Sequence, residues 1–413
     1  MKKRKRIKYG IILIFILIII FIGIRIISQG DDKKEMINVV NQDIKYAREL
    51  LEKNKLEIEI KYEYSNEYEK DKIISQSISE NSEINAGDKV VLVVSLGKID
   101  KEKLAKDQID ELGKVPIMMY HGIENIMNSD TKYTGGNVDK DGYTRTAEAF
   151  RNDLENFYQK GYRMIKLSDY VVGKIDVSYG YSPLILTFDD GNANNIKVTG
   201  RDNEGNIIID KNSAVGILEE YKKKYPDYNV TAIFFITDAL FNQPEYNEEI
   251  LHWLVDNGYE VGNHTKGHNN FSKIDTVKTQ EVVGYMYNKL EGILGDKYQK
   301  IVALPFGSPY KLEHENYPYI INGEYEGKKY STLAALRVGW EPEVSPFNKD
   351  FDKTFLKRCR AYDNGGVEFD IEMILKMLDK SRYISDGNID TIVTKNTKEN
   401  LINKVLDKEI ILY

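Results

Sequence analysis

Two acidic residues, Asp189 and Asp190, directly follow a short apolar run in this chain. The run, Leu184–Phe188, is bounded by Pro183 and Gly191, a pattern that favours a strand buried on both faces. Such a strand has no room for unpaired charge, so carboxylates at its end need compensation, which a metal ion would provide. The carboxyl end of a strand in an α/β sheet or barrel is also where functional sites are usually built. Taken alone, the pair is equally consistent with ordinary residues of a strand end.

Two histidines add the other ligands that a metal site would need. His264 and His268 are four residues apart, a spacing that places both imidazoles on one face of a helical turn. Two imidazoles and one carboxylate suit zinc or a similar divalent ion, with cobalt, nickel and manganese as alternatives. The second carboxylate is then free to act as a base. The pattern therefore indicates metal-assisted hydrolysis.

The elements that must position these side chains alternate between strands and helices from Val115 onward. A polar hairpin is expected around 201–205. Strands are expected at 115–121, 184–190 and 231–236, and helices at 147–160, 214–225 and 247–257. This alternation predicts an α/β fold with a mostly parallel sheet or a closed barrel.

The composition argues against several other classes of protein. The net charge of −7 argues against nucleic acid as the main partner. The single cysteine, Cys359, allows neither an intrachain disulfide nor a multi-cysteine metal site, and is expected to be a buried apolar residue. Histidine chemistry must draw on five residues: His121, His252, His264, His268 and His314.

The N-terminus combines a basic cluster with an apolar run. Six of the first eight residues are lysine or arginine, and Ile11–Ile24 contains apolar residues and one glycine. The pattern predicts that residues 1–30 form a cytoplasmic tail and a single-pass membrane anchor, with the remainder of the chain outside the cell. A cleaved signal peptide ending near Ser28–Gly30 is the alternative.

Residues 36–97 are expected to form a small α+β module. A helix is predicted at 43–54, and strands at 56–64, 72–78 and 89–96. The order resembles a PASTA domain, and the matching segments are Ala47–Leu51, Ile74–Gln76 and Val90–Ser95. Such modules occur outside the cell on proteins that act on or sense peptidoglycan; a simple spacer is the alternative. Residues 98–114 are charged, lack an apolar stripe, and are expected to be a linker.

Three later segments together resemble the polysaccharide deacetylases of carbohydrate esterase family four, the nodulation-protein homology domain. They are Thr187–Gly191, Thr231–Ile236 and Gly258–His268, and they occur in the family's order. The resemblance extends over residues 115–413. It implies a distorted (β/α) barrel that removes N-acetyl groups from N-acetylglucosamine-type sugars of a polymer.

The resemblance also assigns roles to the four residues introduced first. It implies that Asp189 is the general base and that Asp190, His264 and His268 bind the metal. The family's usual C-terminal histidine, which supplies the general acid, is absent from this sequence. His121 is the best substitute, because Met118–Gly122 resembles the branch of the family that deacetylates extracellular poly-N-acetylglucosamine. A hydrogen-bonded core histidine is the alternative for His121.

The third family motif departs from its usual pattern. The segment Ala303–Pro309 lacks the arginine that normally orients the base. The backbone N–H near Phe306 would still serve an oxyanion, since that role needs no particular side chain. Trp340 is either a sugar-stacking wall or part of the core. Three residues are open candidates for the missing cation: Arg337, Arg358 and Arg360.

Of the two remaining histidines, His314 lies in a polar segment and is expected to be exposed, and His252 on a predicted helix is expected to be structural. The sequence as a whole predicts a metal-dependent, membrane-anchored deacetylase of a cell-envelope glycan, with peptidoglycan favoured over poly-N-acetylglucosamine. The missing arginine and histidine leave open a non-catalytic glycan-binding or sensing protein on the same fold. An esterase that removes O-acetyl groups is a third alternative.

Overall fold

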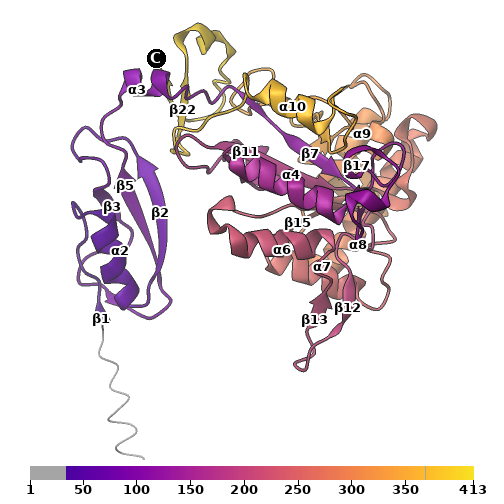
Figure 1. The fold of residues 1–413 in the computed structure, drawn as a ribbon, viewed down its shortest axis with the longest axis horizontal. Coiled ribbons are helices and arrows are strands. Elements are labelled where there is room, and N and C mark those ends of the chain that lie inside the picture. The colour runs from indigo at the N-terminus through magenta and orange to yellow at the C-terminus, as the bar shows by residue number, and fades with distance from the viewer. Residues whose placement is uncertain (1–33, 368) are drawn as a thin grey trace, which may run out of the picture. The chain divides into compact units, whose positions relative to one another are not determined.

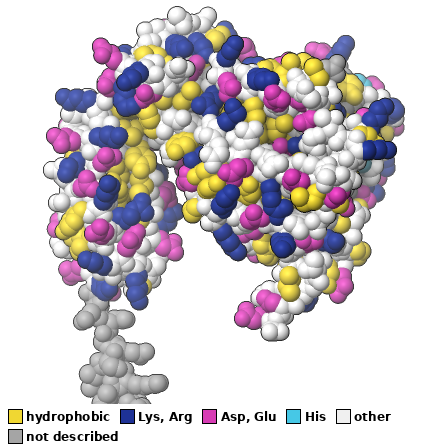
Figure 2. Space-filling model, in the orientation of Figure 1, with side chains coloured by type: hydrophobic (Ala, Val, Ile, Leu, Met, Phe, Trp, Pro, Cys, Tyr) yellow, Lys and Arg dark blue, Asp and Glu magenta, His cyan; other side chains and the backbone are white. Residues whose placement is uncertain are grey.

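The computed structural model describes residues 34–367 and 369–413, which fall into two compact units divided between Ile99 and Asp100 (Figure 1). The predicted membrane anchor at residues 1–30 lies outside the described residues. Within the part of the chain that the structure describes, no helix is both long and apolar enough to cross a membrane. On the face shown in Figure 2, acidic and basic side chains are interspersed over both units.

The first unit contains one helix packed on a three-stranded sheet. Strands β2 and β5 are parallel, and β3 runs antiparallel to β5. Ala47 and Leu51, four residues apart on the helix, are fully buried in one core with Val90 and Leu92 of β5. The predicted helix and three strands are therefore confirmed. The elements are β1 (Lys34–Glu35), α2 (Ile44–Lys53), β2 (Glu57–Glu63), β3 (Ile73–Gln76), β4 (Glu83–Ile84) and β5 (Lys89–Ser95).

The second unit is built on an eight-stranded parallel sheet that forms half a barrel. Its order is β19-β16-β15-β14-β11-β7-β21, with β10 also paired to β11. The expected parallel α/β architecture is present. The strands are β7 (Ile117–Tyr120), β10 (Tyr162–Met164), β11 (Ser182–Phe188), β14 (Ile233–Ile236), β15 (Glu260–Asn263), β16 (Ile301–Ala303), β19 (Ala334–Leu336) and β21 (Cys359–Arg360).

Most of the helices pack on one face of this sheet, whereas the short helix α5 (Leu167–Tyr170) belongs to the core on the opposite face. The remaining strands form small peripheral pairs (Figure 1). The helices are α3 (Lys101–Lys106), α4 (Ala147–Gln159), α5 (Leu167–Tyr170), α6 (Ala214–Lys224), α7 (Asn247–Asp256), α8 (Thr276–Leu294), α9 (Tyr317–Ile321) and α10 (Ile371–Leu378). The strand pairs are β6 (Lys114–Val115) with β20 (Glu343–Val344), β8 (Ile123–Glu124) with β9 (Arg145–Thr146), β12 (Val198–Arg201) with β13 (Ile207–Ile209), β17 (Asn322–Tyr325) with β18 (Lys328–Ser331), and β22 (Thr391–Thr394) with β23 (Glu409–Leu412). The predicted polar hairpin is the β12–β13 pair.

The segment predicted as a linker, residues 98–114, is instead mostly part of the second unit. Leu104 and Ile109 are buried, and so is the carboxylate of Glu111. That carboxylate accepts hydrogen bonds from the hydroxyl of Tyr383 at 2.6 Å and from a backbone amide of β22 at 2.8 Å. The buried apolar residues of this segment, such as Leu104 and Ile109, are too widely spaced to form an apolar stripe on a helix. The many charged residues between them therefore led to the prediction of a linker.

Side chains alternate strictly between the two faces of the central strand β11. Leu186 and Phe188 pack under the helices, whereas Ile185 belongs to a second core on the opposite, concave face. Because neighbouring strands are parallel and in register, the same alternation applies to them. It directs Asp189 and His264, which directly follow β11 and β15, toward the concave face.

The chain between β19 and β21 lies between the two edges of the sheet. The Arg337 amide donates to the Leu356 carbonyl at 2.9 Å, next to β19. Farther along, the Ala361 amide donates to the Met119 carbonyl of β7 at 3.1 Å. This crossing places Arg358 at the carboxyl end of β11, within hydrogen-bond distance of Asp189.

Candidate metal centre and active site

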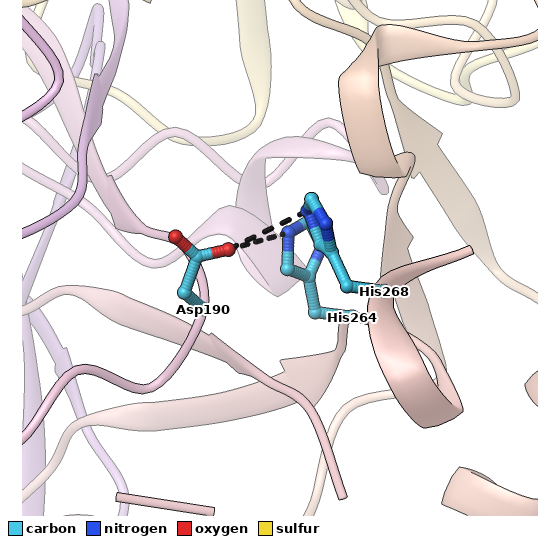
Figure 3. Close-up of side chains that lie close together, drawn as sticks. All are labelled: Asp190, His264 and His268. Carbon is cyan, nitrogen blue, oxygen red and sulfur yellow. Dashed lines mark ion pairs between the residues drawn. The ribbon is translucent and has the colours of Figure 1, made fainter. Parts of the chain in front are cut away.

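Asp190, His264 and His268 converge at the carboxyl ends of β11 and β15 (Figure 3). Asp190 Oδ1 lies 3.3 Å from His264 Nε2 and 3.5 Å from His268 Nε2. His264 Nδ1 lies 2.9 Å from the Ala303 carbonyl, which requires a proton on Nδ1 and leaves the Nε2 lone pair available. Tetrahedral zinc with bonds of about 2.0–2.1 Å separates its ligands by about 3.4 Å. The donor set therefore fits a divalent ion.

Left-handed backbone conformations bring two of these three residues into place. Asp190 follows Asp189 and would by alternation face the helices, but its φ of 77° turns the chain. His268, with φ 48°, ends a short 3₁₀ turn that contains Gly267 at φ 69°. Contrary to the prediction, the two histidines do not lie on one face of a single helical turn. His264 directly follows strand β15. A tight turn then brings His268 back beside His264, and the Asp238 carboxylate stabilises this turn by accepting a hydrogen bond from the Gly267 amide at 2.7 Å.

Asp189 is clamped by a single arginine, Arg358. Guanidinium nitrogens Nη1 and Nη2 each donate to a different carboxylate oxygen of Asp189 at 2.7 Å, and the Arg358 side chain is completely buried. Nη1 also donates to Thr187 Oγ1 at 3.1 Å, and Nε donates to the Arg337 carbonyl at 3.2 Å. Of the three candidate cations, Arg358 is thus the one bound to Asp189, while Arg337 and Arg360 line the adjacent pocket.

This arrangement keeps Asp189 ionised although it is buried. Burial alone would raise the pKa of the Asp189 carboxyl, but the charges of Arg358 and His264 outweigh it and hold that pKa well below the usual range. Burial likewise opposes ionisation of Asp190, and its hydrogen bond with His264 lowers the pKa of that carboxyl overall. Both carboxyls are therefore charged at neutral pH.

His121 lies in the same pocket as the four residues above. Its ring contacts Tyr143 edge-on with 4.8 Å between centroids, and its carbonyl accepts from Asn195 Nδ2 at 2.6 Å. Burial lowers the pKa of His121, while the charges of Asp189 and Asp190 act in the opposite direction. His121 therefore lines the same pocket as the two carboxylates and interacts with them electrostatically.

The other two histidines do not line this pocket. His252 is exposed on α7. His314 is partly buried, and its Nδ1 accepts a hydrogen bond from the Asn316 amide at 3.2 Å. Neither residue is placed to join the metal centre or to donate a proton there.

The pocket has a volume of about 970 Å³ and an aromatic mouth. Phe306 is 54% exposed and its ring lies 4.7 Å from that of His268. Trp340 is also 54% exposed and lies 6.1 Å from the Phe369 ring. Trp340 is therefore a pocket residue and not part of the core. Exposed aromatic faces of this kind suit stacking against the apolar faces of sugar rings.

Family models match two separate parts of the chain. The PASTA domain model matches residues 34–96, and the polysaccharide deacetylase model matches residues 178–316. This chain carries a PASTA domain and a polysaccharide deacetylase domain. No curated protein matches the chain.

Several solved structures resemble the deacetylase domain. The Streptococcus pyogenes deacetylase PplD, in complex with acetate, has 15% identity and a TM-score of 0.43 over 61% of this chain and 93% of its own. The de-N-acetylase from Aggregatibacter actinomycetemcomitans has 12% identity and a TM-score of 0.41 over 64% and 99%, respectively. IcaB from Ammonifex degensii has 15% identity and a TM-score of 0.37 over 60% and 92%.

Several residues of the candidate site lie beyond the stretch that the deacetylase model matches. Arg358 is the most important of them, since the sequence left it as one of three candidates. One signal could have favoured it: Arg358 and Arg360 flank the apolar Cys359 with the period of a strand. A short strand there would direct both arginines to the face opposite Cys359. In the structure Cys359 packs in the core under the helices, as expected for a buried apolar residue.

Proposed function

We propose that the deacetylase domain removes N-acetyl groups from N-acetylglucosamine residues of a cell-envelope glycan, with peptidoglycan favoured. One observation carries this proposal: Asp189, held ionised by Arg358, shares a pocket with a three-ligand group that fits a divalent ion. A hydrolytic site needs both parts together. A non-catalytic glycan-binding protein would have no need for a buried carboxylate oriented by two hydrogen bonds.

In the proposed reaction, Asp189 accepts a proton from the water that attacks the acetyl carbon. Arg358 fixes the orientation of this carboxylate. A divalent ion held by Asp190, His264 and His268, with zinc favoured, would supply Lewis-acid polarisation of the acetyl carbonyl and of the water. The backbone turn at Phe306, on the pocket wall, is proposed to bind the developing oxyanion.

His121 is proposed to complete the reaction as the general acid. It donates its proton to the amide nitrogen as the carbon–nitrogen bond breaks, so that acetate and a free sugar amine are the products. Burial lowers the pKa of His121 overall, while the charges of nearby Asp189 and Asp190 favour its protonated form and oppose part of that effect. Trp340 and Arg337 on the pocket wall are proposed to contact the sugar chain.

The PASTA domain supports peptidoglycan as the substrate, because such modules accompany proteins that act on this polymer. The resemblance of Met118–Gly122 to enzymes acting on poly-N-acetylglucosamine makes that polymer the alternative. The basic and apolar N-terminus supports anchoring of residues 1–30 in the cell membrane, with both domains outside. Cleavage and secretion is the alternative for this segment.

The proposal is tested by acetate release from muropeptides and, separately, from N-acetylglucosamine oligomers, with and without a chelator. We expect release that the chelator abolishes and added zinc restores. Asp189→Asn should abolish release while zinc binding, measured by calorimetry, persists. A purified protein that neither binds zinc nor gains melting temperature from it would instead support the non-catalytic alternative.

His121 has a separate test on the same substrates. His121→Asn should lower kcat by about 10²–10⁴-fold, the usual contribution of a general acid, without changing zinc affinity. His252→Asn is the matched control, because His252 is exposed and outside the pocket. Full turnover by the His121 variant would show that another group protonates the leaving amine.

A further inference from the structure

Most arginines of the deacetylase domain bind a carboxylate. Among the described residues from 100 onward there are eight arginines, and five of them form an ion pair with Asp or Glu. No such ion pair within the described part of the chain involves the other three, which are Arg337, Arg360 and Arg382. Of these, Arg337 and Arg360 line the active-site pocket. The pocket wall therefore carries positive charge that the described carboxylates do not bind.

Arg360 is held in place by aromatic rings instead of by an acid. Its guanidinium lies 3.9 Å from the centre of the Tyr362 ring and 5.4 Å from that of Tyr143. Stacking of this kind restricts the side chain but leaves its N–H groups available at the edge of the plane. Arg360 is also only partly buried. The cation is thus pre-organised to meet a ligand.

The position of Arg360 relates it to the reacting group. Arg360 and Arg358 share the concave face of the sheet, since the intervening Cys359 packs on the other face. Tyr143 contacts both Arg360 and His121, so the guanidinium lies on the side of the pocket where the amine would leave. Asp189 is already neutralised by Arg358 and is not available to Arg360.

We propose that Arg360 binds a carboxylate on the glycan, close to the acetamido group that is hydrolysed. A planar guanidinium matches a carboxylate through two parallel hydrogen bonds, and such charge-assisted bonds are the strong ones. The substrate is then an anionic acetamido glycan, and a neutral N-acetylglucosamine polymer is a poorer one. Two sources fit this chemistry: the lactyl or peptide carboxylates of peptidoglycan, and a uronic acid beside the acetamido sugar. This inference rests on the proposed deacetylase function.

The test compares three oligosaccharides of equal length. One is a neutral N-acetylglucosamine hexamer, one alternates N-acetylglucosamine with glucuronic acid, and one is a peptidoglycan strand with lactyl carboxylates. The full chain should release acetate from one acidic oligomer with a kcat/KM at least about tenfold above that of the neutral one. The better acidic oligomer identifies the source of the carboxylate.

Arg360→Gln should reduce this acidic-to-neutral ratio by about tenfold to a hundredfold, mainly through KM, and Arg360→Lys should reduce it less. Arg382→Gln is the matched control, because Arg382 also lies over a tyrosine, Tyr162, but outside the pocket. It should leave the ratio unchanged. A loss that is equal on acidic and neutral oligomers in the Arg360 variants would overturn the inference.

A binding measurement separates this inference from the proposed function. The Asp189→Asn protein, with and without Arg360→Gln, is titrated with the acidic and neutral oligomers. If no oligomer releases acetate with the unmodified chain, the deacetylase function fails, yet a preference for the acidic oligomer that Arg360→Gln removes still supports Arg360 as the carboxylate site. Equal binding of both oligomers to the Asp189→Asn protein would refute it.

Discussion

Asp189 keeps its charge inside the protein because one guanidinium meets both of its oxygens. The side chains of Asp189 and Arg358 are 3% and 0% exposed. Removing charges from water costs several kcal/mol for each ion, and only good geometry with further hydrogen bonds offsets this cost. Arg358 has that geometry, since it also donates to Thr187 and to a backbone carbonyl. The pair therefore depends on both partners being present.

Breaking this pair should be costly for stability. Arg358→Met should lower the free energy of unfolding by about 3–5 kcal/mol, because it leaves a buried carboxylate without its cation. Adding Asp189→Asn to that variant should recover part of the loss. Urea unfolding followed by tryptophan fluorescence measures the deacetylase domain alone, since Trp253 and Trp340 are the only tryptophans and both lie in it.

An exposed ion pair in the same domain provides the control. Arg201 and Glu249 are 41% and 39% exposed, so Arg201→Gln should cost only about 0–1 kcal/mol. If Arg358→Met were as mild as this control, Asp189 would have to be stabilised by some group other than Arg358. A double variant no more stable than Arg358→Met would mean that lost packing, and not charge, dominates the effect.

At the level of elements, the sequence predicted the alternating strands and helices, but not the segments whose position depends on contacts with distant parts of the chain. The alternation of strands and helices is a local pattern, so the sheet and the positions of Asp189 and His264 could be read from it. Arg358 could not be chosen, because its position depends on the chain between β19 and β21 lying across both sheet edges. The same holds for residues 100–114, whose burial depends on C-terminal partners such as Tyr383.

Gly191 determines the conformation of the turn that follows β11. It has φ 70°, and a Cβ there would lie 2.1 Å from the Leu240 carbonyl oxygen. Gly191→Ala should therefore destabilise the domain by more than the ~1–2 kcal/mol of left-handed strain and should displace Asp190, lowering zinc affinity. Unfolding and zinc titration measure the two effects.

Gly292→Ala in α8 is the matched control for that substitution. A Cβ at this position would meet no atom from outside its own helix within 4 Å, and its φ is not in the left-handed region. Alanine is the better helix former, so this variant should be about 0.5–1 kcal/mol more stable and bind zinc normally. Normal zinc affinity in Gly191→Ala would show that Asp190 does not depend on the turn.

At the level of the whole molecule, the chain combines two units with separate cores. Each unit has its own buried cluster, the first around Leu51 and Leu92 and the second on the two faces of the half-barrel sheet. The two units can therefore be separated experimentally. If the PASTA domain binds the polymer, it raises the local concentration of substrate at the deacetylase domain without touching the chemistry.

Deleting residues 34–99 should therefore affect soluble and polymeric substrates differently. Acetate release from short oligomers should remain unchanged, because the pocket is formed entirely by residues of the second unit. Release from insoluble peptidoglycan should fall by about tenfold or more, because tethering gains of that order are lost with the binding module. Replacing residues 34–99 by an unrelated domain of similar size is the control for simple spacing. Full activity of that chimera on insoluble peptidoglycan would show that the PASTA domain acts only as a spacer.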